Sequence, residues 1–296
     1  MAITERIKRI PNKIKRELLR FPALKVASEL AYKKEVEQHV NYLPEISPVD
    51  SILVDSLRQE GAVVTSLQAL KIPSTSLLLA SSKKLLPELL SLSTNGKHVI
   101  SLPLSKLMEY PEIFLWGLEE RLLNIIENYI CLPVFYHGTD FRREIANGKL
   151  IDVRQWHIDV EDYRMVKVIL YLNDVGLNGG PFEYISKNST SSLRQTLRYS
   201  SGFVSDEVIK TVIPISEWKS CTGRSSTLTF SDTCNVFHRP KPPLEADRFS
   251  ITFSYTSRRP IKIFSKVTLS RDELLGISSR LSRRQKQCIL GYRNLF

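Results

Sequence analysis

Residues 166–172 read Val-Lys-Val-Ile-Leu-Tyr-Leu, an apolar and β-branched run that ends at Asn173-Asp174. Such a run is typical of a buried strand followed by a turn. Eight runs of this kind follow Pro133, separated by Gly, Asn, Asp and Pro: 134–137, 149–156, 166–172, 181–185, 208–215, 226–230, 249–255 and 261–264. Their spacing predicts an antiparallel sandwich or barrel in the second half of the chain.

The first half of the chain has helical patterns instead. Apolar residues predict helices over 49–60, which ends at Gly61, over 76–92, which Pro87 bends or divides, and over 111–131, which has the strongest pattern. A short strand is expected at 62–65. Helices that precede strands favour an α+β domain in which the helices pack on a β-core.

We therefore expect one domain over 46–296, with its β-core at about 133–265 and a basic helical segment at 271–296. Residues 1–45 form a basic extension, in which 3–20 have an amphipathic pattern interrupted by Pro11. The pattern suggests a segment laid on the domain. The alternative is a helix that binds a membrane surface or a partner.

The net charge of +11 is concentrated at the two ends of the chain. Residues 1–34 carry +7 and residues 258–296 carry +8, so the segment between them is at −4. This distribution argues against a nucleic-acid enzyme, although it leaves membrane or protein contact through the ends open. The oligomeric state is undetermined.

The chain has no long apolar run and no secretory signal pattern, and its four cysteines are widely spaced, without a Cys-x-x-Cys pair. We expect a cytoplasmic protein with reduced thiols.

The sequence 157–159, His-Ile-Asp, is the first candidate for a metal site. On a strand, residues i and i+2 share a face, so His157 and Asp159 could bind one ion. His238 could complete the set from another strand. Two imidazoles and one carboxylate are the ligands of non-haem Fe(II) oxygenases. His-x-Asp also occurs by chance, and we interpret the other three histidines, His39, His98 and His137, as structural residues.

Arg248 and Ser250 follow His238 by ten and twelve residues and share a strand face. A guanidinium fork with a neighbouring hydroxyl suits a terminal carboxylate. The alternative for Arg248 is a surface ion pair. Lys167 and Tyr171 also share a face and are candidates for polar groups that line the pocket, the alternative being an outward Lys and a packed Tyr.

Together, these residues resemble the phytanoyl-CoA dioxygenase-like family of Fe(II)/2-oxoglutarate-dependent oxygenases. The resemblance spans about 108–260 and is carried by Trp156-His157-Ile158-Asp159, Val168 to Asp174, Gly180 to Ile185, Thr227 to Phe230, Asp232-Thr233, His238-Arg239 and Arg248-Phe249-Ser250. It implies a double-stranded β-helix, a jelly-roll. It also implies iron on His157, Asp159 and His238, and the distal carboxylate of 2-oxoglutarate on Arg248 and Ser250.

The activity implied is an O2-dependent hydroxylation of an unactivated C–H bond, with release of succinate and CO2. The substrate would be a small metabolite, lipid or glycan intermediate. Asp159 favours a hydroxylase over a halogenase, because related halogenases lack this carboxylate. The chain departs from the family at Asn188-Ser189-Thr190, where relatives usually have Gly-Ser-His. A nucleic-acid-modifying oxygenase and a metal-free, inactive binding protein remain as alternatives.

Overall fold

The computed structural model describes residues 22–261 and 269–290. Helices dominate the first part of the chain. They are α3 (Pro22–His39), η1 (Val40–Tyr42), α4 (Pro48–Glu60), α5 (Leu67–Leu70), α6 (Thr75–Ser91), α7 (Leu104–Leu107), α8 (Glu112–Trp116) and α9 (Glu120–Ile130). Helix α4 begins at the capping side chain of Ser47 and ends at Gly61, whose φ of 87° closes the helix in the left-handed region.

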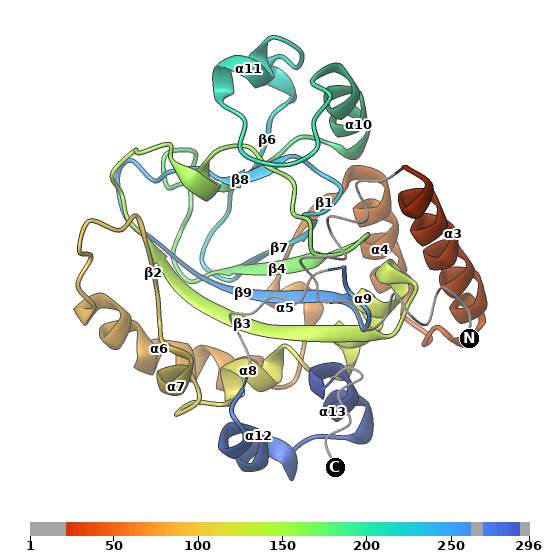
Figure 1. The fold of residues 1–296 in the computed structure, drawn as a ribbon. Helices are drawn as coiled ribbons and strands as arrows, with labels where there is room; N and C mark the ends of the chain where they lie inside the picture. Colours follow the sequence, from red (N-terminus) through yellow and green to blue (C-terminus); the bar gives the residue numbers. More distant parts are fainter. Residues whose placement is uncertain (1–21, 262–268, 291–296) are drawn as a thin grey trace.

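A large antiparallel sheet forms the centre of the molecule (Figure 1). Its strand order is β1-β7-β4-β9-β3-β2. The strands are β1 (Ala62–Ser66), β2 (Val99–Ser101), β3 (Val134–Glu144), β4 (Val166–Tyr171), β7 (Thr227–Asp232) and β9 (Arg248–Ser257). The central β9 pairs with β3 over its whole length and with β4 over six residues.

A smaller antiparallel sheet lies above the large one in Figure 1. It has the order β6-β5-β8, formed by β5 (Phe182–Tyr184), β6 (Lys219–Cys221) and β8 (His238–Pro240). Beyond it lie α10 (Lys187–Thr196), α11 (Asp206–Lys210) and η3 (Ile215–Glu217). The prediction of a mixed fold with helices before antiparallel strands is confirmed.

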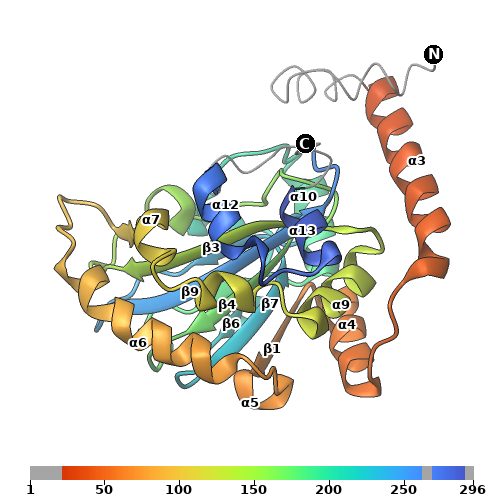
Figure 2. The same ribbon diagram turned by 90° about the horizontal axis from the view of Figure 1, so that it is seen from below.

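The large sheet has one apolar face and one polar face, because side chains alternate along each strand. Phe141, Val168, Leu170, Ile251 and Phe253 are buried in the main core, together with residues of α6, α8 and α9. Figure 2 shows these helices along that face, with α12 (Arg271–Ser278) and α13 (Arg283–Leu290) beside them. The opposite face, turned toward the small sheet, is available for polar side chains.

Three expected elements differ in the structure. Residues 208–215, expected as a strand, begin within α11, because Ser205 and the acidic pair Asp206-Glu207 are suited to a helix N-terminus. Residues 149–156, also expected as a strand, contain the 3-10 turn η2 (Asp152–Arg154), with Asp152 at φ 50°. The helix expected over 111–131 is divided between α8 and α9 near Gly117.

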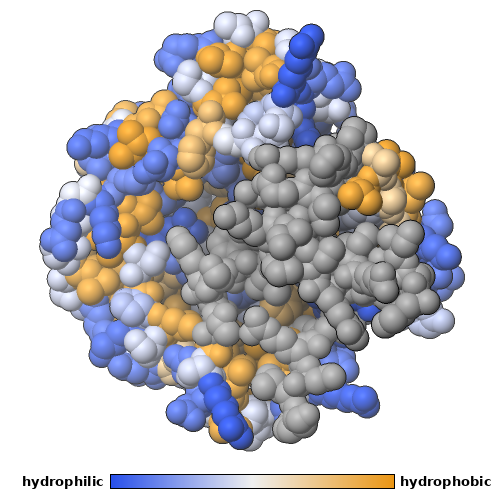
Figure 3. Space-filling model, viewed as in Figure 1, coloured by the Kyte–Doolittle hydropathy of each residue, from blue (hydrophilic) through white to orange (hydrophobic). Residues whose placement is uncertain are grey.

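The basic amphipathic pattern at 3–20 and most of the strand expected at 261–264 lie outside the described residues. Helix α3 precedes the main body and contacts it through the rings of Tyr32 and Tyr163, whose centroids are 4.3 Å apart. No helix within 22–261 or 269–290 combines the length and apolarity needed to cross a membrane. The face shown in Figure 3 mixes hydrophilic and hydrophobic residues.

Candidate metal and co-substrate site

The structure brings together the three predicted metal ligands, His157, Asp159 and His238. Their ligand atoms all lie within 4.8 Å of one another. His157 is in extended backbone just after η2 and forms a bridge with His238, the first residue of β8. The peptide N–H of Asp159 donates to the carbonyl of Thr233 at 2.9 Å, which fixes the second part of the motif.

Both imidazoles present Nε2 to this cluster. The Nδ1 of His157 lies 2.9 Å from the carbonyl oxygen of Gln155, and the Nδ1 of His238 lies 3.2 Å from that of Val236. A carbonyl only accepts, so each Nδ1 carries the proton and each Nε2 keeps a free lone pair. The backbone thereby selects the tautomer that can bind a metal.

Burial lowers the pKa of both histidines. For His238, burial and the neighbouring His157 bring the pKa to about 3, although Asp159 acts in the opposite direction. For His157, burial also lowers the pKa, against the charge of Asp159. Both rings are therefore neutral at pH 7, as metal ligation requires.

Asp159 is held as a carboxylate by nearby cations and imidazoles. Its Oδ2 is 2.5 Å from Nζ of Lys167, and its Oδ1 is 3.8 Å from Nε2 of His157. Burial would raise the pKa of Asp159, but the neighbouring charges, that of the Lys167 ammonium first, outweigh burial and lower the pKa. Two neutral imidazoles and one ionised carboxylate fit the ligand set of Fe(II) in oxygenases.

The cluster opens into a cavity of about 670 Å³ between the two sheets. Alternate residues of three strands of the large sheet form its floor: Asp140 and Arg142 of β3, Lys167 and Ile169 of β4, and Arg248, Ser250 and Thr252 of β9. Phe182, His238 and Pro240 of the small sheet form the opposite wall. Such a volume is typical of small-molecule sites.

Arg248 and Ser250 lie on the same face of β9 and both line this cavity. Arg248 is buried, its Nη1 donates to the carbonyl of Gly180, and its Nη2 is 3.4 Å from Oε1 of Glu144. Its Nε has no hydrogen-bond partner within the described residues. An unpaired donor on a buried guanidinium is costly, and a ligand oxygen would satisfy it.

Lys167 lines the cavity as expected, and its ammonium contacts Asp159. Tyr171 shares the face of Lys167 but is not among the residues that line the cavity. Its hydroxyl donates to the carbonyl of Cys221 and accepts from the peptide N–H of Phe182, both at 2.9 Å. The residues of the small sheet therefore cover Tyr171, which makes the alternative of a packed tyrosine the correct one.

Several residues that surround the site could not be predicted from the sequence. Arg142 lines the cavity beside Ser250, its partner across the β3–β9 pairing. His98, which we expected to be structural, lines the cavity, and the ring of Phe203 packs in a T-shaped arrangement against the ring of His157, with centroids 5.5 Å apart. These side chains come from segments that the sequence alone does not bring together.

Comparison with known proteins shows similarity at the level of structure. No family model matches the sequence, and no curated protein matches it. EctD from S. alaskensis, solved with 2-oxoglutarate and 5-hydroxyectoine, is 16% identical and has a TM-score of 0.51; the match covers 76% of this chain and 81% of that chain.

A second similar structure is SnoN, a non-heme alpha ketoglutarate dependent epimerase from nogalamycin biosynthesis. It is 14% identical with a TM-score of 0.50, and the match covers 75% of this chain and 90% of that chain. At these identities the comparisons establish a shared fold. The case for function therefore depends on the site itself.

Proposed function

We propose that this protein is an Fe(II)- and 2-oxoglutarate-dependent oxygenase that hydroxylates an unactivated C–H bond of a small molecule. The observation that carries the proposal is one cavity that holds both halves of the required site. His157, Asp159 and His238 converge at one place, and Arg248 with Ser250 lies on the floor of the same cavity.

The metal would be held by Nε2 of His157, Nε2 of His238 and a carboxylate oxygen of Asp159. Iron with 2-oxoglutarate supplies the oxidant for the substrate, while O2 is consumed and 2-oxoglutarate leaves as succinate and CO2. The chain provides neutral imidazoles, an ionised carboxylate and the contact of Lys167 with Asp159, which restrains that carboxylate.

The charges near Arg248 suit one additional carboxylate. Three guanidinium groups, those of Arg142, Arg154 and Arg248, surround Glu144, and Asp140 pairs with Arg142 at 3.1 Å. Among the described residues, these two carboxylates face three guanidinium cations, which leaves one positive charge. The distal carboxylate of 2-oxoglutarate would balance this charge and accept from the unpaired Nε of Arg248.

The proposed fold type is the jelly-roll of the phytanoyl-CoA dioxygenase-like enzymes. Support comes from the two facing antiparallel sheets and from the fold shared with EctD and SnoN. Residues 46–296 would form the oxygenase domain, preceded by the extension 1–45. The presence of Asp159 favours hydroxylation over halogenation, and the cavity has the size for a small-molecule substrate beside the co-substrate.

The proposal is tested by anaerobic titration of the purified protein with Fe(II) and 2-oxoglutarate, followed by exposure to air. We expect 2-oxoglutarate to bind only with metal present, and succinate to form slowly even without a primary substrate. A library of metabolites is then screened for stimulation of succinate formation. Succinate formation that is unchanged in His157→Ala would refute the assignment.

A further inference from the structure

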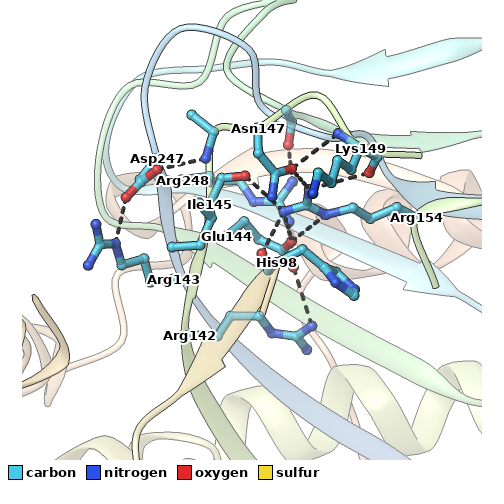
Figure 4. Close-up of polar contacts among 12 residues, drawn as sticks. His98, Arg142, Arg143, Glu144, Ile145, Asn147, Lys149, Arg154, Asp247 and Arg248 are labelled. Atoms are coloured by element: carbon cyan, nitrogen blue, oxygen red, sulfur yellow. Dashed lines mark hydrogen bonds and ion pairs between the residues drawn. The ribbon is translucent and has the colours of Figure 1, made fainter. Parts of the chain in front are cut away.

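Glu144, at the end of β3, is a fully buried carboxylate shared by arginines from three segments (Figure 4). Its Oε2 accepts from Nε and Nη2 of Arg154 at 3.2 and 3.1 Å. Its Oε1 lies 3.4 Å from Nη2 of Arg248 and 3.8 Å from Nη1 of Arg142. One oxygen thus accepts two hydrogen bonds from Arg154, and the other faces the guanidinium groups at the cavity without a hydrogen bond from the described residues.

Arg154 holds this carboxylate from outside the cavity. It is fully buried and does not belong to the cavity wall. Its Nη1 donates to Oδ1 of Asn147 at 2.7 Å, and its Nη2 donates to the carbonyls of His98 and Ile145 at 2.6 and 3.0 Å. Because its partners include backbone carbonyls on two segments, Arg154 has little freedom to move, and neither has Glu144.

The orientation of Arg248 depends on this arrangement. Among the described residues, its polar contacts are the carbonyl of Gly180 and the carboxylate of Glu144, and its Nε has no hydrogen-bond partner. The carbonyl of Gly180 is the one hydrogen-bond acceptor of the guanidinium group in the described part of the chain, and Glu144 holds the group by an ion pair at 3.4 Å, which would be lost without Glu144. The group could then turn, and the direction of its donors would no longer be fixed.

We propose that Glu144, clamped by Arg154, is a positioning residue that aims Arg248 at the distal carboxylate of 2-oxoglutarate. This inference rests on the proposed function. Arg154 also precedes His157 by only three residues, so the same ion pair connects the segment that carries the metal ligands to the co-substrate anchor.

Charge-conserving substitutions separate this geometric role from a change in local charge. Glu144→Asp shortens the side chain that carries the carboxylate. Arg154→Lys removes the two hydrogen bonds that Arg154 donates to Glu144, and in both variants the net charge stays the same. With the Mn(II)-loaded protein, the Kd values of 2-oxoglutarate and of 2-oxopentanoate, which lacks the distal carboxylate, are measured by calorimetry. We expect both variants to raise the Kd of 2-oxoglutarate about tenfold, as for the loss of one charge-assisted hydrogen bond.

The Kd values of Mn(II) and of 2-oxopentanoate should stay within about twofold of the wild type, which a general loss of structure would not allow. Asp247→Glu is the matched control. Its carboxylate also pairs with an arginine of β3, Arg143, at 2.5 Å and accepts from the N–H of Ala146 at 2.7 Å, but it does not line the cavity. This variant should leave the Kd of 2-oxoglutarate unchanged.

The inference is overturned if both charge-conserving variants bind 2-oxoglutarate like the wild type while Arg248→Met binds it weakly. In that case the proposed function still stands. A wild type that does not bind 2-oxoglutarate overturns both. If Glu144→Asp does not fold, two variants replace it: Arg154→Lys, and the double variant Glu144→Gln/Arg154→Met, which removes both charges together. The quantity compared is again the Kd of 2-oxoglutarate relative to the Kd of 2-oxopentanoate.

Discussion

His157 and His238 exchange two backbone hydrogen bonds, from the N–H of each to the carbonyl of the other, at 3.1 and 3.0 Å. In an antiparallel pair this exchange places the two side chains on one face. Their ring centroids are accordingly 4.3 Å apart. The spacing of the two imidazoles is therefore set by paired backbone and does not depend on the conformation of a loop.

His238→Ala should abolish tight metal binding. We expect the affinity for Mn(II) to fall by more than about a hundredfold, because loss of a ligand exceeds the 10- to 100-fold effect of changing a residue that supports a ligand. Calorimetry measures the binding, and the rise in Tm with Mn(II) gives a second readout. His137→Gln is the control, since His137 is buried against Thr256 and outside the cluster. Equal Mn(II) affinity in His238→Ala would contradict the assignment.

Arg248→Met should weaken 2-oxoglutarate binding with little change in metal affinity. A charge-assisted hydrogen bond contributes about 1.5–3 kcal/mol, so the loss of the contact from Nε predicts a Kd about ten- to a hundredfold higher. Titration of the Mn(II)-loaded protein with 2-oxoglutarate measures this effect. Arg143→Met, on the opposite face of the same sheet, should bind 2-oxoglutarate normally. A similar loss in both variants would count against a specific role for Arg248.

Gly180→Ala should reduce both stability and co-substrate affinity. Gly180 has φ +73°, and an added Cβ would lie 2.7 Å from the carbonyl oxygen of Lys241 and from atoms of Pro243. We expect a loss of about 1–3 kcal/mol in the free energy of unfolding. The carbonyl that holds Arg248 would also shift. Gly176→Ala, with open space around it, should change stability by less than about 0.5 kcal/mol in the same urea titration.

Acid should destabilise the protein partly through His137. Burial, assisted by the charge of Lys167, lowers the pKa of His137 to about 4, below the unfolded value of about 6.5. The folded state then binds fewer protons, so the stability from this group is full above pH 6.5 and is lost as the pH falls toward 4. Its maximum size is about 3 kcal/mol.

In His137→Gln, the free energy of unfolding should therefore decline less between pH 6.5 and 4 than in the wild type. Denaturant titrations at several pH values measure the two slopes. Parallel declines would show that His137 is protonated to the same extent in the folded and unfolded states.

The alternation of side chains explains why most strands could be predicted from sequence. β4, β7 and β9 each combine β-branched or aromatic residues with turn residues at their ends. The failures at 149–156 and 208–215 have a local cause. In both, a polar residue governs the backbone: Asp152 adopts a positive φ, and Ser205 starts a helix. The apolar content of a segment does not indicate such local effects on the backbone.

The proposed metal ligands could be inferred because two of them are separated by one residue. The supporting charges could not, since their partners are distant in sequence and their pairing requires the folded sheet. Arg248, for example, pairs with Glu144, which lies more than a hundred residues earlier in the chain. Tyr171 was expected to line the cavity because alternation along a strand predicts which face of the sheet a side chain is on. Alternation does not predict which other residues cover that face.

The composition of the cavity wall has a consequence for the durability of the protein. Within the described part of the chain, the residues that line it include no Met, Cys, Trp or Tyr, the side chains that a strong oxidant attacks most readily. The four cysteines are buried, and none lines the cavity. If the protein is the oxygenase proposed above and oxygen is activated without substrate, the described cavity wall offers none of these four kinds of side chain to the oxidant, so we expect inactivation to be slow.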